Sequence, residues 1–180
     1  MQDFAPGKDA PQLATSSTAE EWAAQGRELF NQKRYGPAKH CYTRAKIPKL
    51  AAVAGAYYSR QKARSIAKVK QTLSDRRLAF RAAADAFFDC AAAETTESVK
   101  TTYLRNSAKC FEEANDLERA AYVYRLAKDF NRSGELYRDL KKFDEAVDIV
   151  EAEEDQMHPD IVNSIIKRAR LAYFDAQDIE

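Results

Sequence analysis

The sequence predicts an all-α fold, an α-solenoid of about nine helices in which antiparallel helix hairpins stack on one another. Three observations lead to this prediction. Apolar residues lie three or four positions apart within most segments, which marks one face of a helix and not the alternation of a strand. Alanine is abundant, whereas the 180 residues include only 5 Gly and 5 Pro, a composition that favours helices. Finally, apolar positions recur at a fixed period in residues 108–150.

This repeat has a 13-residue period. A helix of about 11 residues followed by a two-residue turn would produce it. Polar pairs occupy the predicted joints, beginning at Asn115, Lys128 and Lys141. A unit this short cannot bury its own apolar stripe, so it has to stack on its neighbours. The recurring positions are Phe111, Tyr124, Tyr137 and Val150, then Ala108, Ala121, Gly134 and Val147, and then Leu117, Phe130 and Phe143.

The composition limits the class of protein. A hydrophobic content of 45% and a charged content of 32% indicate a globular chain. No apolar run approaches the roughly 20 residues that span a bilayer, and the N-terminus lacks a signal-peptide core, so we expect an intracellular protein, cytoplasmic or nuclear, without a membrane partner. The odd cysteine count, Cys41, Cys90 and Cys110, predicts core residues in a reducing compartment. The net charge of +1 creates no overall field that would attract nucleic acid.

The predicted elements begin after a leader. Residues 1–17 contain Pro, Gly and a Thr-Ser-Ser run and are interpreted as a flexible leader or linker, followed by a single helical repeat domain over residues 18–180. Thr18 and Glu21 have the spacing of a capping box, which predicts a helix start. A turn near Arg34 and a second helix with Pro37 in its first turn follow.

These two helices carry a pattern that resembles the tetratricopeptide repeat, W-x-x-x-G-x-x-[LY] followed by A-x-x-x-[FY]-x-x-A. The same order returns at positions 104–127 and again at positions 130–150. Small residues at the pairs Gly26/Ala38 and Ala108/Ala120 are expected where the helices of a hairpin come closest. The positions to which we assign this structural role are Trp22, Gly26, Ala38, Tyr42, Ala108, Ala120, Tyr124, Gly134 and Ala146.

The middle of the chain departs from the pattern. Residues 51–69 predict one helix, and Phe80, Ala83, Phe87 and Cys90 mark the buried face of the next. The interval between Tyr58 and Phe80 is about 16 residues longer than the tetratricopeptide consensus allows. This leaves elongated helices or an inserted basic segment as alternatives. The hairpin period of the last units is also shorter than that of the usual repeat, so an irregular solenoid is expected. Pro159 opens a last helix, interpreted as a cap.

The resemblance extends to a more specific family. Residues 22–45, with the array at residues 110–151 behind them, look like the tetratricopeptide-like region of large fungal UvrD-like helicases and of related proteins that also carry ankyrin repeats. That resemblance implies that the chain is part of a longer ATP-dependent helicase. The phosphate-binding motif G-x-x-x-x-G-K-[ST] is missing from the 180 residues, so the ATPase residues would lie outside them.

The sequence offers little chemistry of its own. His40 and His158 are far apart in sequence, and His40 and Cys41 diverge by about 100° on a helix, which argues against a shared metal ion. No cysteine or serine lies in a nucleophile motif. We therefore expect a chain without catalytic residues, bound metal or cofactor.

One candidate partner groove follows from the resemblance to co-chaperone tetratricopeptide domains, which grip a carboxylate with Lys, Asn and Arg. Ala23 and Arg27, or Ala52 and Ala56, stand in the earlier units where Lys and Asn are needed, so the clamp is incomplete. A looser basic groove for an acidic segment and an ordinary solvated face remain as alternatives. The candidate groove residues are Arg105, Asn106, Lys109, Lys128 and Arg132.

A second candidate surface is the basic segment of residues 60–77, where seven cations face one acid, Asp75, for a local charge of +6. Clustered cations are what phosphate contact requires. However, the segment contains no aromatic residue on which single-stranded bases could stack. The outer side of a long helix, or a site for an acidic partner, would have the same clustered cations. The cations are Arg60, Lys62, Arg64, Lys68, Lys70, Arg76 and Arg77.

An acidic stretch at residues 144–155 lies toward the other end of the chain. It could orient a partner or meet the basic segment of another copy, although a solvated face would have the same composition. Together, these patterns predict a non-catalytic protein–protein interaction module within a larger multidomain protein. The alternatives are a nucleic-acid-facing accessory region of a helicase and a structural spacer between domains.

Overall fold

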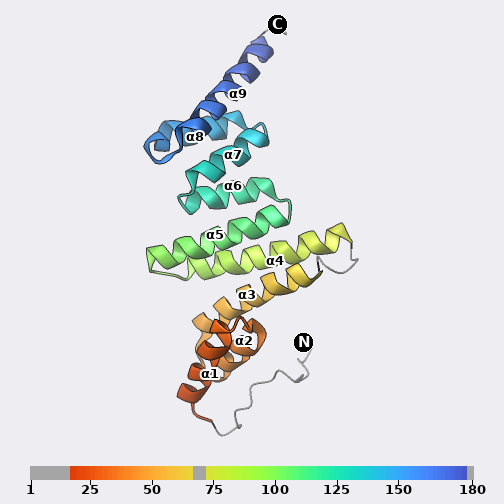
Figure 1. Cartoon of the computed structure of the whole chain (residues 1–180), viewed down its shortest axis with the longest axis vertical. Helices are drawn as coiled ribbons and strands as arrows, with labels where there is room; N and C mark the ends of the chain where they lie inside the picture. The colour runs from red at the N-terminus through yellow and green to blue at the C-terminus, as the bar shows by residue number, and fades with distance from the viewer. Residues whose placement is uncertain (1–16, 67–71, 178–180) are drawn as a thin grey trace. The chain divides into compact units, whose positions relative to one another are not determined.

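Helices account for all the regular structure in residues 17–66 and 72–177, which are the residues that the computed structural model describes (Figure 1). Nine α-helices and one 3₁₀ turn occur in those ranges, and no strand does, so the all-α prediction is confirmed there. None of these helices has the length and the apolar content needed to cross a bilayer. The chain divides into two compact units, Met1–Ala93 (unit 1) and Glu94–Glu180 (unit 2). The prediction of a single repeat domain stays a prediction.

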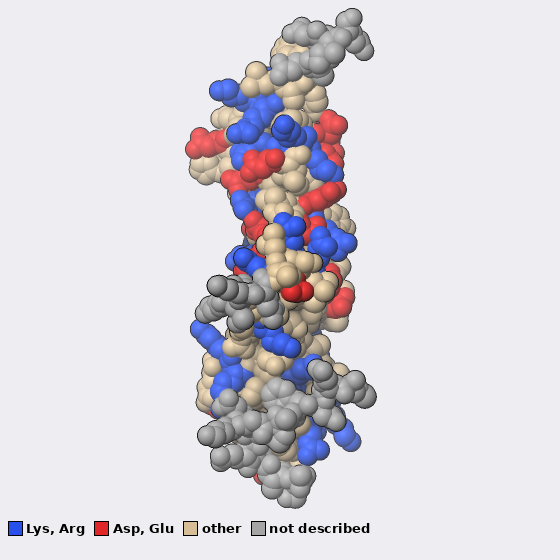
Figure 2. Space-filling view, turned by 90° about the vertical axis from the view of Figure 1, so that its right-hand side faces the viewer, with Lys and Arg blue, Asp and Glu red and all other residues tan. Residues whose placement is uncertain are grey.

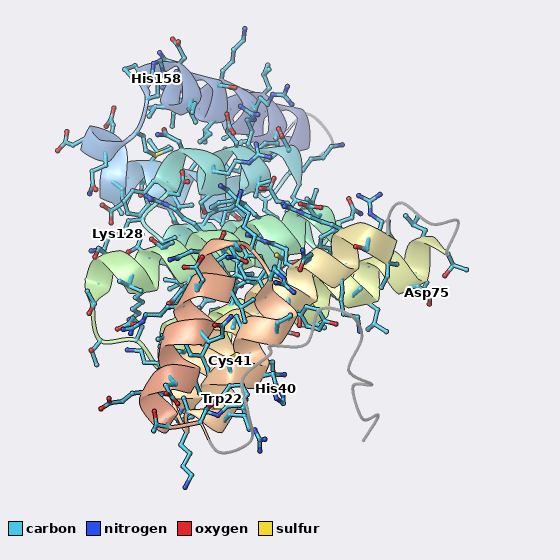
Figure 3. The ribbon with its side chains drawn as sticks, turned by 60° about the horizontal axis from the view of Figure 1, so that its bottom comes forward. Trp22, His40, Cys41, Asp75, Lys128 and His158 are labelled. Carbon is cyan, nitrogen blue, oxygen red and sulfur yellow. The ribbon has the colours of Figure 1, made fainter. Side chains whose placement is uncertain are left out.

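Unit 1 contains α1 (Ala19–Asn31), α2 (Tyr35–Arg44), α3 (Pro48–Ile66) and α4 (Leu73–Ala92). Each helix packs against the next one along the chain. The core between α1 and α2 contains Trp22, Leu29, Ala38, Cys41 and Tyr42, all buried (Figure 3). Gly26 lets α1 and α2 pack closely, because a Cβ atom at this position would lie only 2.8 Å from the Tyr42 ring.

Side-chain caps mark where two of these helices begin. Thr18 accepts a hydrogen bond from the backbone N–H of Glu21, whose carboxylate accepts one from the backbone N–H of Thr18, so the predicted capping box is present. Thr72 caps α4 by accepting from the backbone N–H of Asp75. Both caps satisfy backbone donors that have no partner within the helix.

Unit 2 contains α5 (Glu97–Glu113), α6 (Leu117–Leu126), α7 (Phe130–Asp139), α8 (Phe143–Glu153), the short 3₁₀ turn η1 (Glu154–Gln156) and α9 (Pro159–Gln177). Consecutive helices pack on each other, and α9 contacts both α7 and α8. The buried hydroxyl of Ser133 in α7 donates a 2.8 Å hydrogen bond to the carbonyl of Ala121 in α6. Gly134 gives α9 room, because a Cβ there would lie 2.8 Å from Cδ1 of Ile165.

The sequence period reappears in the backbone of the turns. Lys33 and Lys46 are separated by one period, as are Asn115, Lys128 and Lys141 in succession, and all five have a positive φ of 57–61°. In each turn, the following residue donates its N–H to a carbonyl five positions earlier, as in a Schellman closure. Helices α6 and α7 have ten residues and are separated by three-residue joints, so the expected division into eleven and two is off by one residue.

The middle of the chain consists of long helices. Helices α3 and α4 have 19 and 20 residues, which favours the elongated-helix alternative for the described part. Residues 67–71 lie outside the described residues, and so do residues 1–16, which include nearly all of the predicted leader. The α5 helix has 17 residues and is longer than the repeat predicts. The stacking of hairpins into a solenoid stays a prediction.

Candidate interaction surfaces

The predicted partner groove falls within unit 2. Arg105, Asn106 and Lys109 lie on α5, Lys128 lies in the turn before α7, and Arg132 lies on α7. Arg105, Lys109 and Lys128 are exposed, whereas Asn106 and Arg132 are half-buried. The five residues therefore come from α5, from the turn between α6 and α7, and from α7, and they differ in their exposure to solvent.

Two of these cations are paired with carboxylates of the same chain. The guanidinium of Arg132 donates hydrogen bonds to Glu112 on α5 and, at 3.0 Å, to Glu135 on α7. The ammonium of Lys128 lies 3.7 Å from the carboxylate of Glu97. Because an incoming carboxylate would have to displace Glu112 to reach Arg132, the predicted groove offers fewer available cations than its sequence suggests.

The contact between Arg132 and Glu112 belongs to a network that joins α5, α6 and α7. The hydroxyl of Tyr124 on α6 donates a 2.5 Å hydrogen bond to the same Glu112 carboxylate. Hydrogen bonding to Glu112 raises the pKa of Arg132, and burial followed by the Glu112 bond raises the pKa of Tyr124. Both shifts keep the groups in the protonated form that donates, so this network holds three helices together.

The predicted basic segment is described in part. Arg60, Lys62 and Arg64 lie near the end of α3, and Arg76 and Arg77 lie near the start of α4. The end of α3 and the start of α4 lie on the same side of unit 1 (Figure 1). Four of the five are exposed, the exception being the half-buried Arg60. Two further candidates, Lys68 and Lys70, lie outside the described residues.

Folding brings aromatic rings to this segment that the sequence pattern did not predict. The guanidinium of Arg60 lies 5.1 Å from the ring centre of Tyr57 and 5.2 Å from that of Phe87. Tyr57 in turn stacks on Tyr35, with ring centres 5.0 Å apart. These rings come from α2, α3 and α4, so counting aromatics within residues 60–77 could not find them. Tyr57 and Phe87 hold Arg60 against the helices by cation–π contact.

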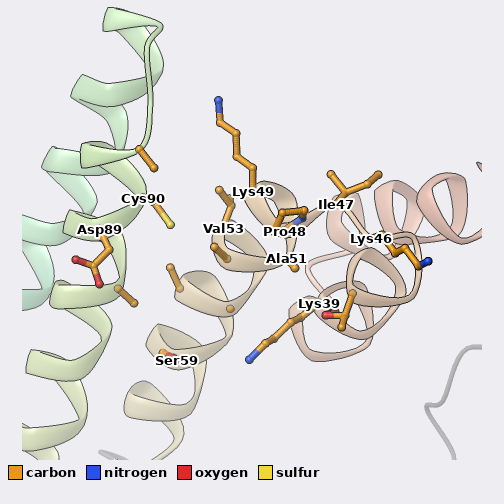
Figure 4. A pocket seen from close by; sticks show the side chains of 16 residues that line it. Lys39, Lys46, Ile47, Pro48, Lys49, Ala51, Val53, Ser59, Asp89 and Cys90 are labelled. Carbon is orange, nitrogen blue, oxygen red and sulfur yellow. Dashed lines mark hydrogen bonds between the residues drawn. The ribbon is translucent and has the colours of Figure 1, made fainter. Parts of the chain in front are cut away.

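Sequence reasoning missed a groove in unit 1, which has a volume of about 940 Å³. Its floor is α3, where the small residues Ala52, Gly55 and Ala56 lie. One wall comes from α2 and the turn after it, and the other comes from the end of α4 with Asp89 and Cys90 (Figure 4). The sequence signal for this groove is the run of mostly small residues 51–56. Core packing of a helix explains such a run equally well.

Lysine side chains border this groove. Lys39 comes from α2, Lys46 from the turn and Lys49 from the first turn of α3 (Figure 4). The stem of Lys39 lies along Gly55, with Cδ 3.6 Å from the position of a Cβ atom there. Asp89 is the sole acidic residue among the described residues that line the groove, so the margin is mainly cationic over an apolar floor.

The two units carry opposite charge. Residues 1–93 contain 16 Lys and Arg against 8 Asp and Glu, a net +8, whereas residues 94–180 contain 13 against 20, a net −7. On the face drawn in Figure 2, unit 1 shows mainly Lys and Arg, and unit 2 shows charges of both signs. The overall charge of +1 therefore hides a strong separation, which gives unit 1 a field that attracts acidic partners.

The outer face of α9 is a further surface. Leu171, Tyr173 and Phe174 are 46–66% exposed, although a helix that closes a repeat array usually has a polar outer face. The hydroxyl of Tyr173 donates a 2.6 Å hydrogen bond to Asp144 of α8. Nothing in the described structure indicates what would cover these side chains.

Metal-ligating groups do not gather in residues 17–66 and 72–177, where no group of three His, Cys, Asp or Glu could hold an ion. The ring of His40 meets Trp22 edge-on while Cys41 points into the core (Figure 3). Cys41, Cys90 and Cys110 are buried and not disulfide-bonded, and burial raises the thiol pKa of Cys41 and Cys90.

Comparison with known proteins gives no relative: no protein-family model, curated protein or solved structure matches the chain. The resemblances to tetratricopeptide repeats and to fungal UvrD-like helicases therefore rest on the repeat positions alone.

Proposed function

We propose that this chain is a non-catalytic protein–protein interaction module, built as a tetratricopeptide-like array of helix hairpins and belonging to a larger multidomain protein. The periodic recurrence of left-handed turn residues supports the repeat architecture. A stacked array presents extended surfaces that suit the binding of protein segments. Its candidate binding site is the groove that α2, α3 and α4 form in unit 1.

The groove is the observation that carries this proposal. Its volume of about 940 Å³ is at the upper end of the range for ligand sites. The small residues Ala52, Gly55 and Ala56 let an apolar side chain of a partner reach the backbone of α3. The ammonium groups of Lys39 and Lys46 at its margin favour carboxylates beside that apolar residue. The expected ligand is therefore a protein segment that combines apolar and acidic residues.

Selection from a random peptide library against the full chain tests the proposal. We expect the selected peptides to be acidic with apolar anchors and to bind the chain in fluorescence anisotropy. Gly55→Trp places a large side chain in the groove, where a Cβ meets only the flexible stem of Lys39, and should abolish this binding.

The matched control is Ala82→Trp, because Ala82 is an exposed residue of α4 that does not line the groove. Binding should survive in this variant. Peptides that bind Gly55→Trp as tightly as the parent chain would show that the groove is not the site, and a library without binders would argue against the module itself.

Nucleic-acid binding by a helicase accessory region is the second candidate function. The observation that favours it is the exposure of Lys62, Arg64, Arg76 and Arg77 within the positively charged unit 1. Anisotropy of labelled single- and double-stranded DNA and RNA should then reveal binding that weakens steeply with salt. Arg76→Glu/Arg77→Glu should abolish it and leave peptide binding in the groove unchanged. Failure to bind at low salt would retire this candidate.

A further inference from the structure

Two lysines on the groove margin lack an ion-pair partner in the described part of the chain. Lys39 and Lys46 are both exposed, and neither ammonium lies within ion-pair distance of a described carboxylate. Asp89, across the groove on α4, is the one carboxylate among the described lining residues. The groove lining therefore carries more positive than negative side chains, with Lys39, Lys46 and Lys49 against Asp89.

The outer face of α8 presents the complementary group. Asp148 and Glu151 on α8 and Asp155 in η1 are exposed and form no ion pair with any described residue. Asp148 and Glu151 are three residues apart in α8, which places them on the same side of the helix, and Asp155 follows in η1. Exposed Ala152 lies beside Glu151 and gives this side an apolar contact next to the carboxylates. Other acids of this region are already engaged, as the bond from Tyr173 to Asp144 shows.

The two surfaces also fit in length. Asp148, Glu151 and Ala152 extend over about 6 Å along the axis of α8, within the roughly 10 Å rise of the groove floor from Ala52 to Ser59. Small residues on the groove floor and Ala152 on α8 permit the close helix approach of about 8 Å at which small side chains meet. The net charges of +8 in unit 1 and −7 in unit 2 would accelerate the encounter.

We propose that the groove of one copy of the chain binds the outer face of α8, with Asp148 and Glu151, of a second copy. This inference rests on the proposed function, since it names the partner of the same groove. The contact joins two different surfaces, so it is heterologous, and every copy contributes both halves. Because exposed charges dominate it, the association weakens as salt screens them.

Sedimentation velocity of the full chain over a concentration series tests this. We expect association at low salt that declines by about 0.5 M salt. A groove variant, Lys39→Glu/Lys46→Glu, and an α8 variant, Asp148→Lys/Glu151→Lys, should each be monomeric alone. An equimolar mixture of the two should associate again, because the intact groove of the α8 variant meets the intact α8 of the groove variant.

The control variant Lys62→Glu/Arg77→Glu makes the same change in the charge of unit 1 away from the groove. It should associate as the parent chain does, which separates specific docking from a general charge effect. Circular dichroism checks that each variant folds, and all four altered positions of the test variants are exposed.

A parent chain that stays monomeric at low salt, or a mixture that stays monomeric, would overturn the inference. So would association of either test variant alone at the parent level. The α8 variant retains the groove, so its binding of library peptides reports on the proposed function separately. If that binding persists while the chain is monomeric, the groove binds another protein and only the second-copy inference fails.

Discussion

Lys39 of α2 lies along Gly55 of α3, with its Cδ, Cε and Nζ atoms 3.6–3.8 Å from where a Cβ atom at Gly55 would be. The absence of a side chain at position 55 leaves room for the lysine stem beside the floor of the unit 1 groove. This is an ordinary van der Waals separation, so the site tolerates a small side chain.

Gly55→Ala is therefore expected to stabilise unit 1 by about 0.5–1 kcal/mol, because alanine favours a helix interior over glycine. Gly26→Ala in α1 should instead destabilise it by about 1–3 kcal/mol, since the new Cβ would lie 2.8 Å from the buried ring of Tyr42. Denaturant unfolding of the two variants measures both changes. Equal shifts in the same direction would contradict the packing described at one of the two positions.

Ala120→Leu should overpack the contact that α6 makes with its neighbours. Ala120 is fully buried, and the larger side chain is expected to cost about 1–3 kcal/mol. Ala152→Leu in the same unit is the control, because Ala152 is exposed and its replacement should stay within about 0.5 kcal/mol. Thermal unfolding compares them. A fully stable Ala120→Leu variant would mean that the repeat alignment at this position is wrong.

Lys141→Val should destabilise unit 2 by about 1–2 kcal/mol, because a β-branched residue is poorly tolerated at a φ of 59°. Lys141→Gly should be at least as stable as the parent chain, since glycine adopts this conformation without steric cost. As a reference, Lys167→Val in the middle of α9 should cost no more than about 0.7 kcal/mol in helix propensity. Urea unfolding measures the free energy of unfolding of each variant. Equal losses for Lys141→Val and Lys167→Val would contradict the left-handed conformation at Lys141.

Tyr124→Phe removes the hydrogen bond to Glu112 and should cost about 1–3 kcal/mol near neutral pH. The pKa of Tyr124 is raised above its unfolded value of about 10. The stability that the protonated hydroxyl contributes is therefore complete below pH 10 and is lost as the pH rises from there toward the folded-state pKa. The difference between parent and variant should narrow above pH 10 in unfolding measurements. A difference that is constant with pH would rule out this hydrogen bond as its origin.

The sequence predicted the helices and their joints well. The repeat period placed joints at Asn115, Lys128 and Lys141, and these three residues have the left-handed backbone of the turns. The capping box at Thr18 and the helix start at Pro159 are also confirmed. Spacing and capping depend on residues within one turn of each other, so they can be recognised without knowing the tertiary contacts.

The candidate surfaces were harder to predict because their character depends on contacts between helices. Arg132 looked available for a partner, yet Glu112 on another helix accepts a hydrogen bond from it. Arg60 looked like part of a bare basic segment, yet it lies over the rings of Tyr57 and Phe87. Neither pairing follows from a spacing rule, since each depends on how neighbouring helices are rotated.

The sequence by itself determined that this chain is helical, where several of its turns fall, and that its second half repeats at a constant period. Only the tertiary structure decided which charged groups are paired and where a groove opens. The physical reason is one of range. Helix formation and turn closure are settled among residues four or five positions apart, whereas the pairing of Arg132 and the exposure of Lys39 depend on the side chains that packing places beside them.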